Sequence, residues 1–361
     1  MAQTVNDKPG VTDLSRDVHV SSTSIEKSLA DLWRAENVEQ EAITRAALWN
    51  VVAHTATSDH HWQASETLSH ASAAVPQRTI VVHATLEGDP ELRSWISANC
   101  HLAGERKQVC SEEIDIVARG EHVERVPPLV NALLLPDMPV AVWWIGDLPN
   151  ENETYVEQML DPADRIIVDS VHFDRPADLE LVQRVGDQTT TNPADLNWLR
   201  FEDWRMATAS VFDPPAMRAR LGEIRRIRVA AVTERPFFGE LIEAVYFASW
   251  ISAQLGHQVD ADGRVEGIEY EFERRSGGIP GSLAGVELGF ADGASATIAR
   301  DAERGLLTAT VGGVTTAPDS VTRTLGKRPE ELIVRLLKQP DADRLLDKVL
   351  PIAIRMAKRV A

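Results

Sequence analysis

The order of apolar and polar residues predicts a chain in which strands and helices alternate. Short β-branched runs are separated by segments whose apolar residues recur at helical spacing. The predicted strands are residues 79–86, 107–118, 138–146, 164–170 and 223–232. The predicted helices follow the Ser/Thr cluster 21–24 and lie near 39–55, 90–98, 122–134, 153–160, 177–185, 196–212 and 237–254. We therefore expect an α/β fold with a mixed or mostly parallel sheet and helices on both faces.

The predicted strand 138–146 carries two adjacent indoles, Trp143 and Trp144. Neighbouring residues on a strand point to opposite faces, so both can be buried only where helices cover both sides of the sheet. We expect a central strand here. Each buried indole N–H should also need a hydrogen-bond partner, such as a loop carbonyl.

The pattern changes after Gly256. Residues 267–277 alternate apolar and acidic side chains, which indicates a half-exposed antiparallel strand. Further strands are expected at 286–290, 294–300 and 305–311, the first two joined by an Asp292-Gly293 turn, before helices at 328–338 and 341–359. The predicted organisation is a disordered tail at 1–21, an N-terminal α/β domain with leading helices at 22–256, and a smaller α+β domain with an antiparallel sheet and two helices at 257–361.

The chain is acidic, with 37 Lys and Arg against 55 Asp and Glu and a net charge of −18. Such a charge repels phosphate backbones and anionic lipid headgroups, so neither nucleic acid nor a membrane is an expected partner. No secretory signal is evident, and no apolar run reaches the ~20 residues that a membrane span needs. We expect a cytoplasmic protein.

Motifs for cofactors, metals and hydrolytic chemistry are weak. His60 and His61, with His54 and His70 nearby, are better interpreted as surface histidines than as metal ligands, because no Cys or carboxylate set completes the coordination. The glycine-rich stretch 275–285 has neither phosphate-loop order, and no G-x-S-x-G elbow occurs. We expect no cofactor, no metal and no catalytic residues.

Asp169, Ser170 and His172 are the most enzyme-like group, because they follow a predicted strand at its carboxyl end, where open α/β sheets bind ligands. Asp169 and Ser170 should point to opposite faces, so the spacing alone builds no nucleophile–base pair. One interpretation is capping and packing of the following loop. The alternative is a sensor or enzyme that binds an anionic metabolite in a crevice near Asp147, Asp169 and His172.

The two cysteines, Cys100 and Cys110, allow a redox pair if their segments lie across a hairpin. Two unreactive thiols in a reducing cytosol are the favoured interpretation.

The helix predicted at 196–212 is the best candidate for a partner surface. It carries Trp198, Arg200, Trp204 and Arg205, and Arg200 lies four residues before Trp204, as an arginine–indole stack requires. Trp and Arg dominate protein–protein hot spots. Packing is the favoured interpretation for the two indoles, which leaves the arginines as the better interface candidates. We expect Arg200→Glu with Arg205→Glu to weaken partner binding and leave the fold intact.

Several segments together resemble the glucose-6-phosphate dehydrogenase assembly protein family, usually called OpcA. The resemblance rests on their order, and above all on combining the LL-PD-PV-WW and DL-W-R-WR patterns. The segments are SIEKSLADLW (24–33), ITRAALWNVV (43–52), VCSEEIDIVARG (109–120), VPPLVNALLLPDMPVAVWWIGDLP (126–149), ADRIIVDSVHF (163–173) and DLNWLRFEDWR (195–205).

The resemblance implies a protein without catalysis of its own. Members of the family bind glucose-6-phosphate dehydrogenase, promote its active oligomer and raise its activity, which feeds the oxidative pentose phosphate pathway. In cyanobacterial members, redox control is attributed to cysteines in the C-terminal part. No cysteine of this chain lies beyond Cys110, so we do not expect control by that route.

Overall fold

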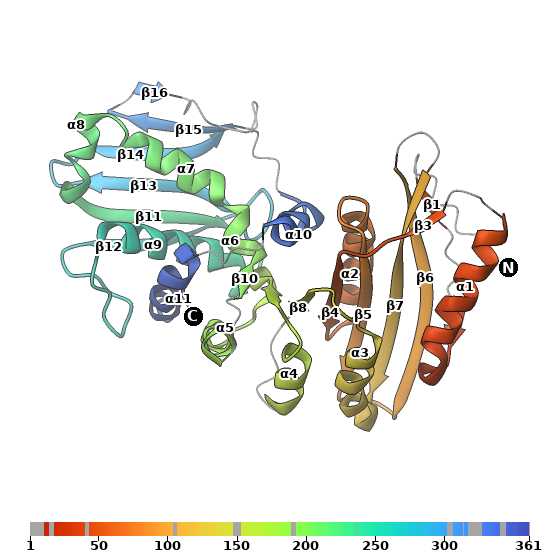
Figure 1. Ribbon diagram of the computed structural model, residues 1–361. Coiled ribbons are helices and arrows are strands. Elements are labelled where there is room, and N and C mark those ends of the chain that lie inside the picture. Colours follow the sequence, from red (N-terminus) through yellow and green to blue (C-terminus); the bar gives the residue numbers. More distant parts are fainter. Residues whose placement is uncertain are drawn as a thin grey trace. The chain divides into compact units, whose positions relative to one another are not determined.

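The computed structural model describes residues 11–13, 18–39, 43–103, 107–146, 153–188, 193–235, 237–301, 306–312, 314–316, 327–339 and 344–360. The chain divides into two compact units (Figure 1). Unit 1 is Met1–Ile167 with Pro329–Pro340, and unit 2 is Val168–Arg328 with Asp341–Ala361. The boundary predicted at residue 256 does not coincide with this division.

Unit 1 is built on a mixed sheet with the strand order β1-β6-β7-β5-β4-β8-β9, in which β2 pairs with β6 and β3 with β7. The four central strands β7, β5, β4 and β8 are parallel, whereas β6 is antiparallel to β7. The strands are β1 (Val11–Asp13), β2 (Val18–Val20), β3 (Ile43–Arg45), β4 (Trp49–Thr55), β5 (Gln77–Thr85), β6 (Glu91–Ala103), β7 (Lys107–Arg119), β8 (Val140–Ile145) and β9 (Arg165–Val168).

Helices cover both faces of this sheet, as predicted. From α1 (Ile25–Glu39), Trp33 donates its indole N–H to Glu112 of β7, whereas Ser65 of α2 (Ser58–Ser72) donates to Glu113. Because neighbouring residues of a strand point to opposite faces, α1 and α2 must lie on different sides. The other helices of unit 1 are α3 (Val126–Leu133), α4 (Glu153–Leu160) and α10 (Pro329–Lys338).

The paired indoles of β8 are both buried, which confirms the predicted central strand. Trp144 stacks on His54 of β4 with 3.8 Å between ring centroids, and Tyr155 of α4 meets the same pair edge-on. The Tyr155 hydroxyl lies 3.0 Å from His54 Nε2, and burial lowers the pKa of His54 to about 3. On the other face, Trp143 Nε1 has no hydrogen-bond partner among the described residues, so the expected carbonyl partner is absent there.

Three predictions for unit 1 are wrong. Residues 90–98 belong mainly to strand β6 rather than to a helix, and the helix expected near 39–55 is replaced by strands β3 and β4 from residue 43 onwards. Short segments of the predicted disordered tail, β1 and β2, pair with β6. The other residues of that tail up to 17 lie outside the described residues.

A segment rich in Ser, His and Ala follows residue 56 and forms α2. Thr57 is the N-cap of this helix, and its side chain accepts a hydrogen bond from the His60 N–H.

Unit 2 contains a second sheet with the strand order β12-β11-β13-β14-β15-β16. Its strands are β11 (Ile224–Val232), β12 (Glu269–Arg275), β13 (Leu283–Phe290), β14 (Ser295–Asp301), β15 (Leu306–Val311) and β16 (Val314–Thr316). Its helices are α5 (Pro176–Gln188), α6 (Leu196–Arg200), α7 (Glu202–Val211), α8 (Pro215–Arg218), α9 (Ile242–Leu255) and α11 (Arg344–Ala357), and the short β10 (Ala194–Asp195) precedes α6.

The second sheet corrects two expectations. The alternation of strands and helices in the sequence predicts that strand β11 belongs to the first sheet. In the structure, β11 pairs with β12 and β13 in unit 2. Strand β12 shows the predicted alternation, yet it runs parallel to β11 rather than antiparallel. The Asp292-Gly293 turn between β13 and β14 is confirmed, with Gly293 at φ 85°, a conformation that favours glycine.

Candidate functional site

The residues singled out at the end of β9 form a buried polar network in unit 2. Asp169 is 1% exposed and accepts two hydrogen bonds from Arg200 at the end of α6, at 2.5 and 2.6 Å. Arg200 follows Asp169 by 31 residues, so the ion pair joins two distant segments. A two-pronged arginine–carboxylate contact of this kind fixes both groups in orientation.

A second carboxylate, Asp195, completes the network. Its Oδ1 accepts the backbone N–H of Asn197 at 2.8 Å, which makes it the N-cap of α6, and the backbone N–H of Ser170 at 3.2 Å. Its Oδ2 accepts the Tyr246 hydroxyl of α9 at 2.8 Å. The loop after β9, the start of α6 and helix α9 are therefore held together through one buried side chain.

Burial and the Arg200 guanidinium shift the pKa values of the carboxyl groups in the network. Burial by itself raises the pKa of Asp169, but the Arg200 guanidinium more than compensates and holds that pKa below its usual value. Burial raises the pKa of Asp195, as does the neighbouring Asp169 charge. Burial also raises the pKa of Glu243 to about 7, although its Oε2 accepts the Leu283 N–H at 2.9 Å.

This geometry favours packing over ligand binding at Asp169. Both oxygens of Asp169 bind Arg200, and the His172 ring nitrogen lies 3.9 Å from Oδ2, beyond hydrogen-bond distance. Asp147, the third residue of the predicted crevice, lies outside the described residues. The group stabilises the loop after β9, and no observation at these described residues favours an anionic metabolite there.

The four candidate partner residues lie mainly in the interior of unit 2. Trp198, Trp204 and Arg205 are buried, and Arg200 is about one-fifth exposed. The predicted arginine–indole stack exists with a different pairing, since the Arg205 guanidinium lies 3.7 Å from the centre of the Trp198 ring. Arg205 also donates to the Trp198 carbonyl at 2.9 Å across the break between α6 and α7. Their role in partner binding stays a prediction, and the double glutamate substitution is not the clean test expected from the sequence.

Several large apolar side chains that the sequence did not single out are exposed. Trp62 of α2 is 76% exposed, and Leu86, just after β5, is 55% exposed. Both follow the carboxyl ends of neighbouring parallel strands, β4 and β5, and so lie at the same edge of the sheet. On α6 and α7, the exposed large apolar residue is Met206, whereas Trp198 and Trp204 are buried. Neither residue type nor periodicity reveals which apolar side chains are exposed. The sequence pattern therefore indicates α6 and α7 as the partner surface and does not single out Trp62 or Leu86.

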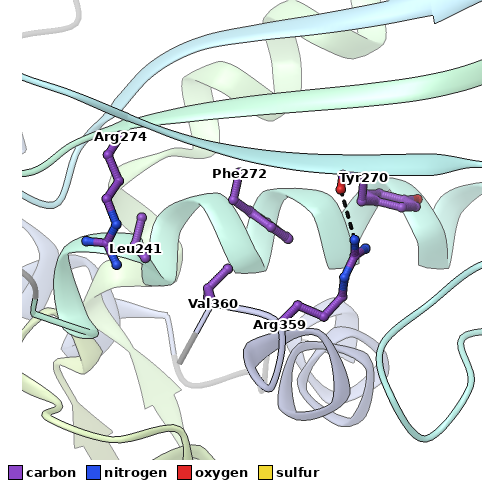
Figure 2. A pocket seen from close by; sticks show the side chains of 6 residues that line it. All are labelled: Leu241, Tyr270, Phe272, Arg274, Arg359 and Val360. Carbon is purple, nitrogen blue, oxygen red and sulfur yellow. Dashed lines mark hydrogen bonds between the residues drawn. The ribbon is translucent and has the colours of Figure 1, made fainter.

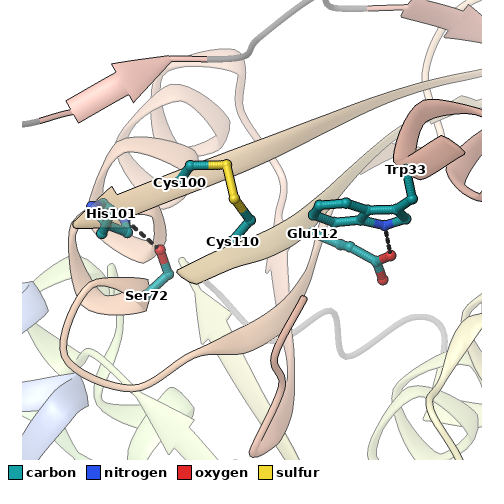
Figure 3. Close-up of a disulfide and its surroundings, with 6 residues drawn as sticks. All are labelled: Trp33, Ser72, Cys100, His101, Cys110 and Glu112. Atoms are coloured by element: carbon teal, nitrogen blue, oxygen red, sulfur yellow. Dashed lines mark hydrogen bonds between the residues drawn. A yellow bond between two sulfur atoms is a disulfide. The ribbon is translucent and has the colours of Figure 1, made fainter. Parts of the chain in front are cut away.

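Cys100 and Cys110 form a disulfide between β6 and β7, shown in Figure 3. The two residues lie directly opposite in the antiparallel register, with 4.0 Å between their Cα atoms, so the hairpin condition is met. The interpretation as two free thiols is wrong for this structure. Trp33 of α1 packs over the buried pair, and its hydrogen bond to Glu112 at 2.5 Å holds it there.

The remaining sequence motifs build no site in the described part of the chain. No cluster of three His, Cys, Asp or Glu residues is arranged to hold a metal ion there. His61 instead lies 3.1 Å from the Asp115 carboxylate, and His54 packs on Trp144. None of the helices within the described ranges is both long and apolar enough to cross a bilayer.

Two protein-family models match the chain in succession. The N-terminal domain of the glucose-6-phosphate dehydrogenase subunit matches residues 68–184, and the C-terminal domain of the same family matches residues 191–350. The first match begins inside α2 and the second ends inside α11. Together the two models account for most of the chain.

Curated relatives and solved structures give further similarities. The putative OxPP cycle protein OpcA of Synechococcus elongatus is 31% identical over 202 residues, 55% of this chain and 44% of that protein. That of Synechocystis sp. is 31% identical over 188 residues, 51% of this chain and 38% of that protein. The matched part thus spans less than half the length of each relative.

Among solved structures, a dehydrogenase from Chromobacterium violaceum superimposes with a TM-score of 0.47 at 10% identity. The superposition covers 87% of this chain and 95% of that one. This similarity is too distant to support an assignment.

Proposed function

Because this chain belongs to the OpcA family of glucose-6-phosphate dehydrogenase assembly proteins, we propose that it binds glucose-6-phosphate dehydrogenase and raises its activity without catalysing a reaction itself. The role would lie in the cytoplasm and support the oxidative pentose phosphate pathway. The two consecutive family models carry the proposal, because they match both units of the chain.

Activation by a binding partner requires a difference in affinity. The protein can shift the dehydrogenase towards its active form only if it binds that form more tightly than the inactive one. Coupling of this kind is typically worth about 1–3 kcal/mol, or roughly 5- to 150-fold in the equilibrium. No reacting group of this chain is needed for such an effect.

Buried contacts that hold segments of both units together support a docking role. A buried ion pair and a buried N-cap fix the segments around β9 and α6, and the stacked aromatic residues fix the end of β8. A surface that is already ordered loses less conformational entropy when it binds. Rigid elements of this kind suit a protein that acts by contact.

Within this proposal, the edge of unit 1 that carries Trp62 and Leu86 is the contact surface. The Trp62 side chain is 76% exposed. Tryptophan is among the residue types most enriched at the hot spots of protein–protein interfaces. Trp62 lies on an ordered helix, so its position is defined before the partner arrives. Single exposed apolar residues are common on protein surfaces. This edge differs because it carries two large exposed apolar side chains, Trp62 and Leu86.

The test is direct binding of the purified protein to its cognate dehydrogenase, measured by analytical ultracentrifugation at micromolar concentration. The proposal predicts a larger species that contains both chains. A dehydrogenase whose sedimentation does not change over that range would contradict it. Bovine serum albumin at equal mass serves as the control for crowding.

A further inference from the structure

A small cavity in unit 2 lies between β12 and the residues that follow α11 (Figure 2). Its volume is about 310 Å³, at the lower end of the range for ligand pockets. It is lined by Leu241, Tyr270, Phe272, Arg274, Arg359 and Val360. Two of these lining residues are arginines and none is acidic, in a chain whose net charge is −18.

The alternating pattern of β12 explains why a bare arginine faces this cavity. Tyr270, Phe272 and Arg274 occupy every second position and share one face of the strand. The acidic residues between them share the other face, where Glu271 accepts from Arg228 at 2.5 Å and Glu273 accepts from Arg275. The strand therefore keeps its carboxylates away from Arg274.

The two guanidinium groups retain free donors. Within the described ranges, neither Arg274 nor Arg359 forms an ion pair. Arg359 donates one hydrogen bond, from Nη2 to the Tyr270 carbonyl at 3.1 Å, which fixes its side chain against the strand (Figure 2). A guanidinium has five N–H donors, so most of those of Arg359 are not used in that contact.

The apolar residues of the cavity lie between the two charges. In Figure 2, Phe272 descends from β12 and Val360 rises towards it, with Arg274 on one side and Arg359 on the other. Tyr270 is buried and its hydroxyl is held by Ser252 at 2.5 Å, so this wall of the cavity is fixed. Two cations that flank an apolar centre are suited to a small ligand with a short carbon skeleton and more than one oxyanion.

We propose that this cavity binds a small anionic metabolite that carries carboxylate or phosphate groups, with Arg274 and Arg359 as its charged contacts. Planar guanidinium groups pair with either anion through two parallel hydrogen bonds. The ligand would neutralise two like charges that otherwise share one cavity, and Phe272 would contact its carbon skeleton. This site is separate from the Asp169 network, and it does not depend on the role proposed above.

The experiment is isothermal titration calorimetry of the full chain at constant ionic strength. The three probes are inorganic phosphate, glucose 6-phosphate and citrate, so that phosphate and carboxylate recognition are distinguished. The variants are Arg274→Gln and Arg359→Gln. Arg264→Gln is the matched control because its side chain is 73% exposed and is not among the residues that line the cavity. Arg274→Gln is the decisive variant, because Arg274 makes no ion pair within the described residues that the fold would lose.

The proposal predicts saturable binding of at least one probe, with an affinity at least about tenfold lower in Arg274→Gln and in Arg359→Gln and unchanged in Arg264→Gln. Saturation by citrate alone would identify a carboxylate site, and saturation by either phosphate probe a phosphate site. Absence of saturable binding to all three probes at millimolar concentration would overturn the proposal. Binding that Arg274→Gln leaves unchanged would overturn it as well.

Discussion

At the residue scale, the ion pair between Asp169 and Arg200 is the contact that the sequence could not reveal. Each partner is visible as a polar residue near the end of an element, but a sequence separation of 31 places a whole helix, α5, between them. Local spacing cannot report which of 37 basic residues meets a given carboxylate. For the same reason, the sequence points to a partner surface for Arg200 and not to the interior.

Arg200→Ala should strongly destabilise the fold. Removing the guanidinium leaves the Asp169 carboxylate buried without a counter-ion, which typically costs about 3–5 kcal/mol. Urea denaturation monitored by circular dichroism measures the change. Arg34→Ala, which breaks an exposed pair with Asp31 on α1, is the matched control and should change stability little. Equal effects of the two variants would contradict the role of Arg200 in the buried network.

Glu243 should make the protein less stable as the pH rises towards neutrality. Burial raises its pKa from 4.5 to about 7, so between these values the folded protein holds a proton that the unfolded chain has released. The free energy of unfolding then falls with rising pH across that window and levels off above it. Glu243→Gln keeps an oxygen for the Leu283 N–H and should remove a fall on the order of 3 kcal/mol. Parallel slopes for the two proteins in urea denaturations at a series of pH values would refute this.

Substitution of Trp62 tests whether the edge of unit 1 that carries it is the surface that contacts the dehydrogenase. Trp62→Ala should weaken dehydrogenase binding by about tenfold or more and leave the melting temperature nearly unchanged, because the side chain is mostly in solvent. Met206→Ala, another exposed apolar residue but in unit 2, is the control and should bind normally. If both variants bind as the native protein does, the contact surface lies elsewhere.

At the scale of elements, periodicity predicts the buried parallel strands well and the hairpin of unit 1 badly. In β6, Leu92, Trp95 and Ile96 have helical spacing, but continuous pairing with β7 along the whole strand decides the conformation. Residues 46–48 favour a helix by propensity, whereas β4 is an apolar run buried on both faces, which periodicity alone cannot distinguish from a helix. The alternation of β12 is visible in the sequence, but its direction is set by the connection through α9 and the segment after it.

The disulfide belongs to this scale because it joins β6 to β7. Protein purified in air without thiol reagents should be lighter than its reduced form by two hydrogen atoms in mass spectrometry. The bond closes a loop with a sequence separation of 10, so its loss should cost about 2–3 kcal/mol of unfolding free energy. The Cys100→Ala, Cys110→Ala variant should match the reduced native protein in stability. A native protein that carries two free thiols after aerobic purification would exclude the bond.

At the scale of the whole molecule, the sequence predicts the fold class but not how the chain is shared between two units. The strand β11 follows the alternating elements of unit 1 and has the same β-branched composition, so nothing local shows that it pairs in the second sheet. Helix α10 lies late in the sequence and still belongs to unit 1. Such assignments depend on contacts between distant residues, whereas the family is recognisable because its motifs are continuous segments.

We propose that this protein activates the dehydrogenase by contact. A titration of the purified dehydrogenase with this protein, with binding by fluorescence anisotropy and initial rates of NADPH formation recorded in the same samples, tests it most directly. The expected result is that activity rises to a plateau with the same midpoint as binding. Binding without any kinetic change, or a reaction that this protein catalyses with no dehydrogenase present, would contradict it.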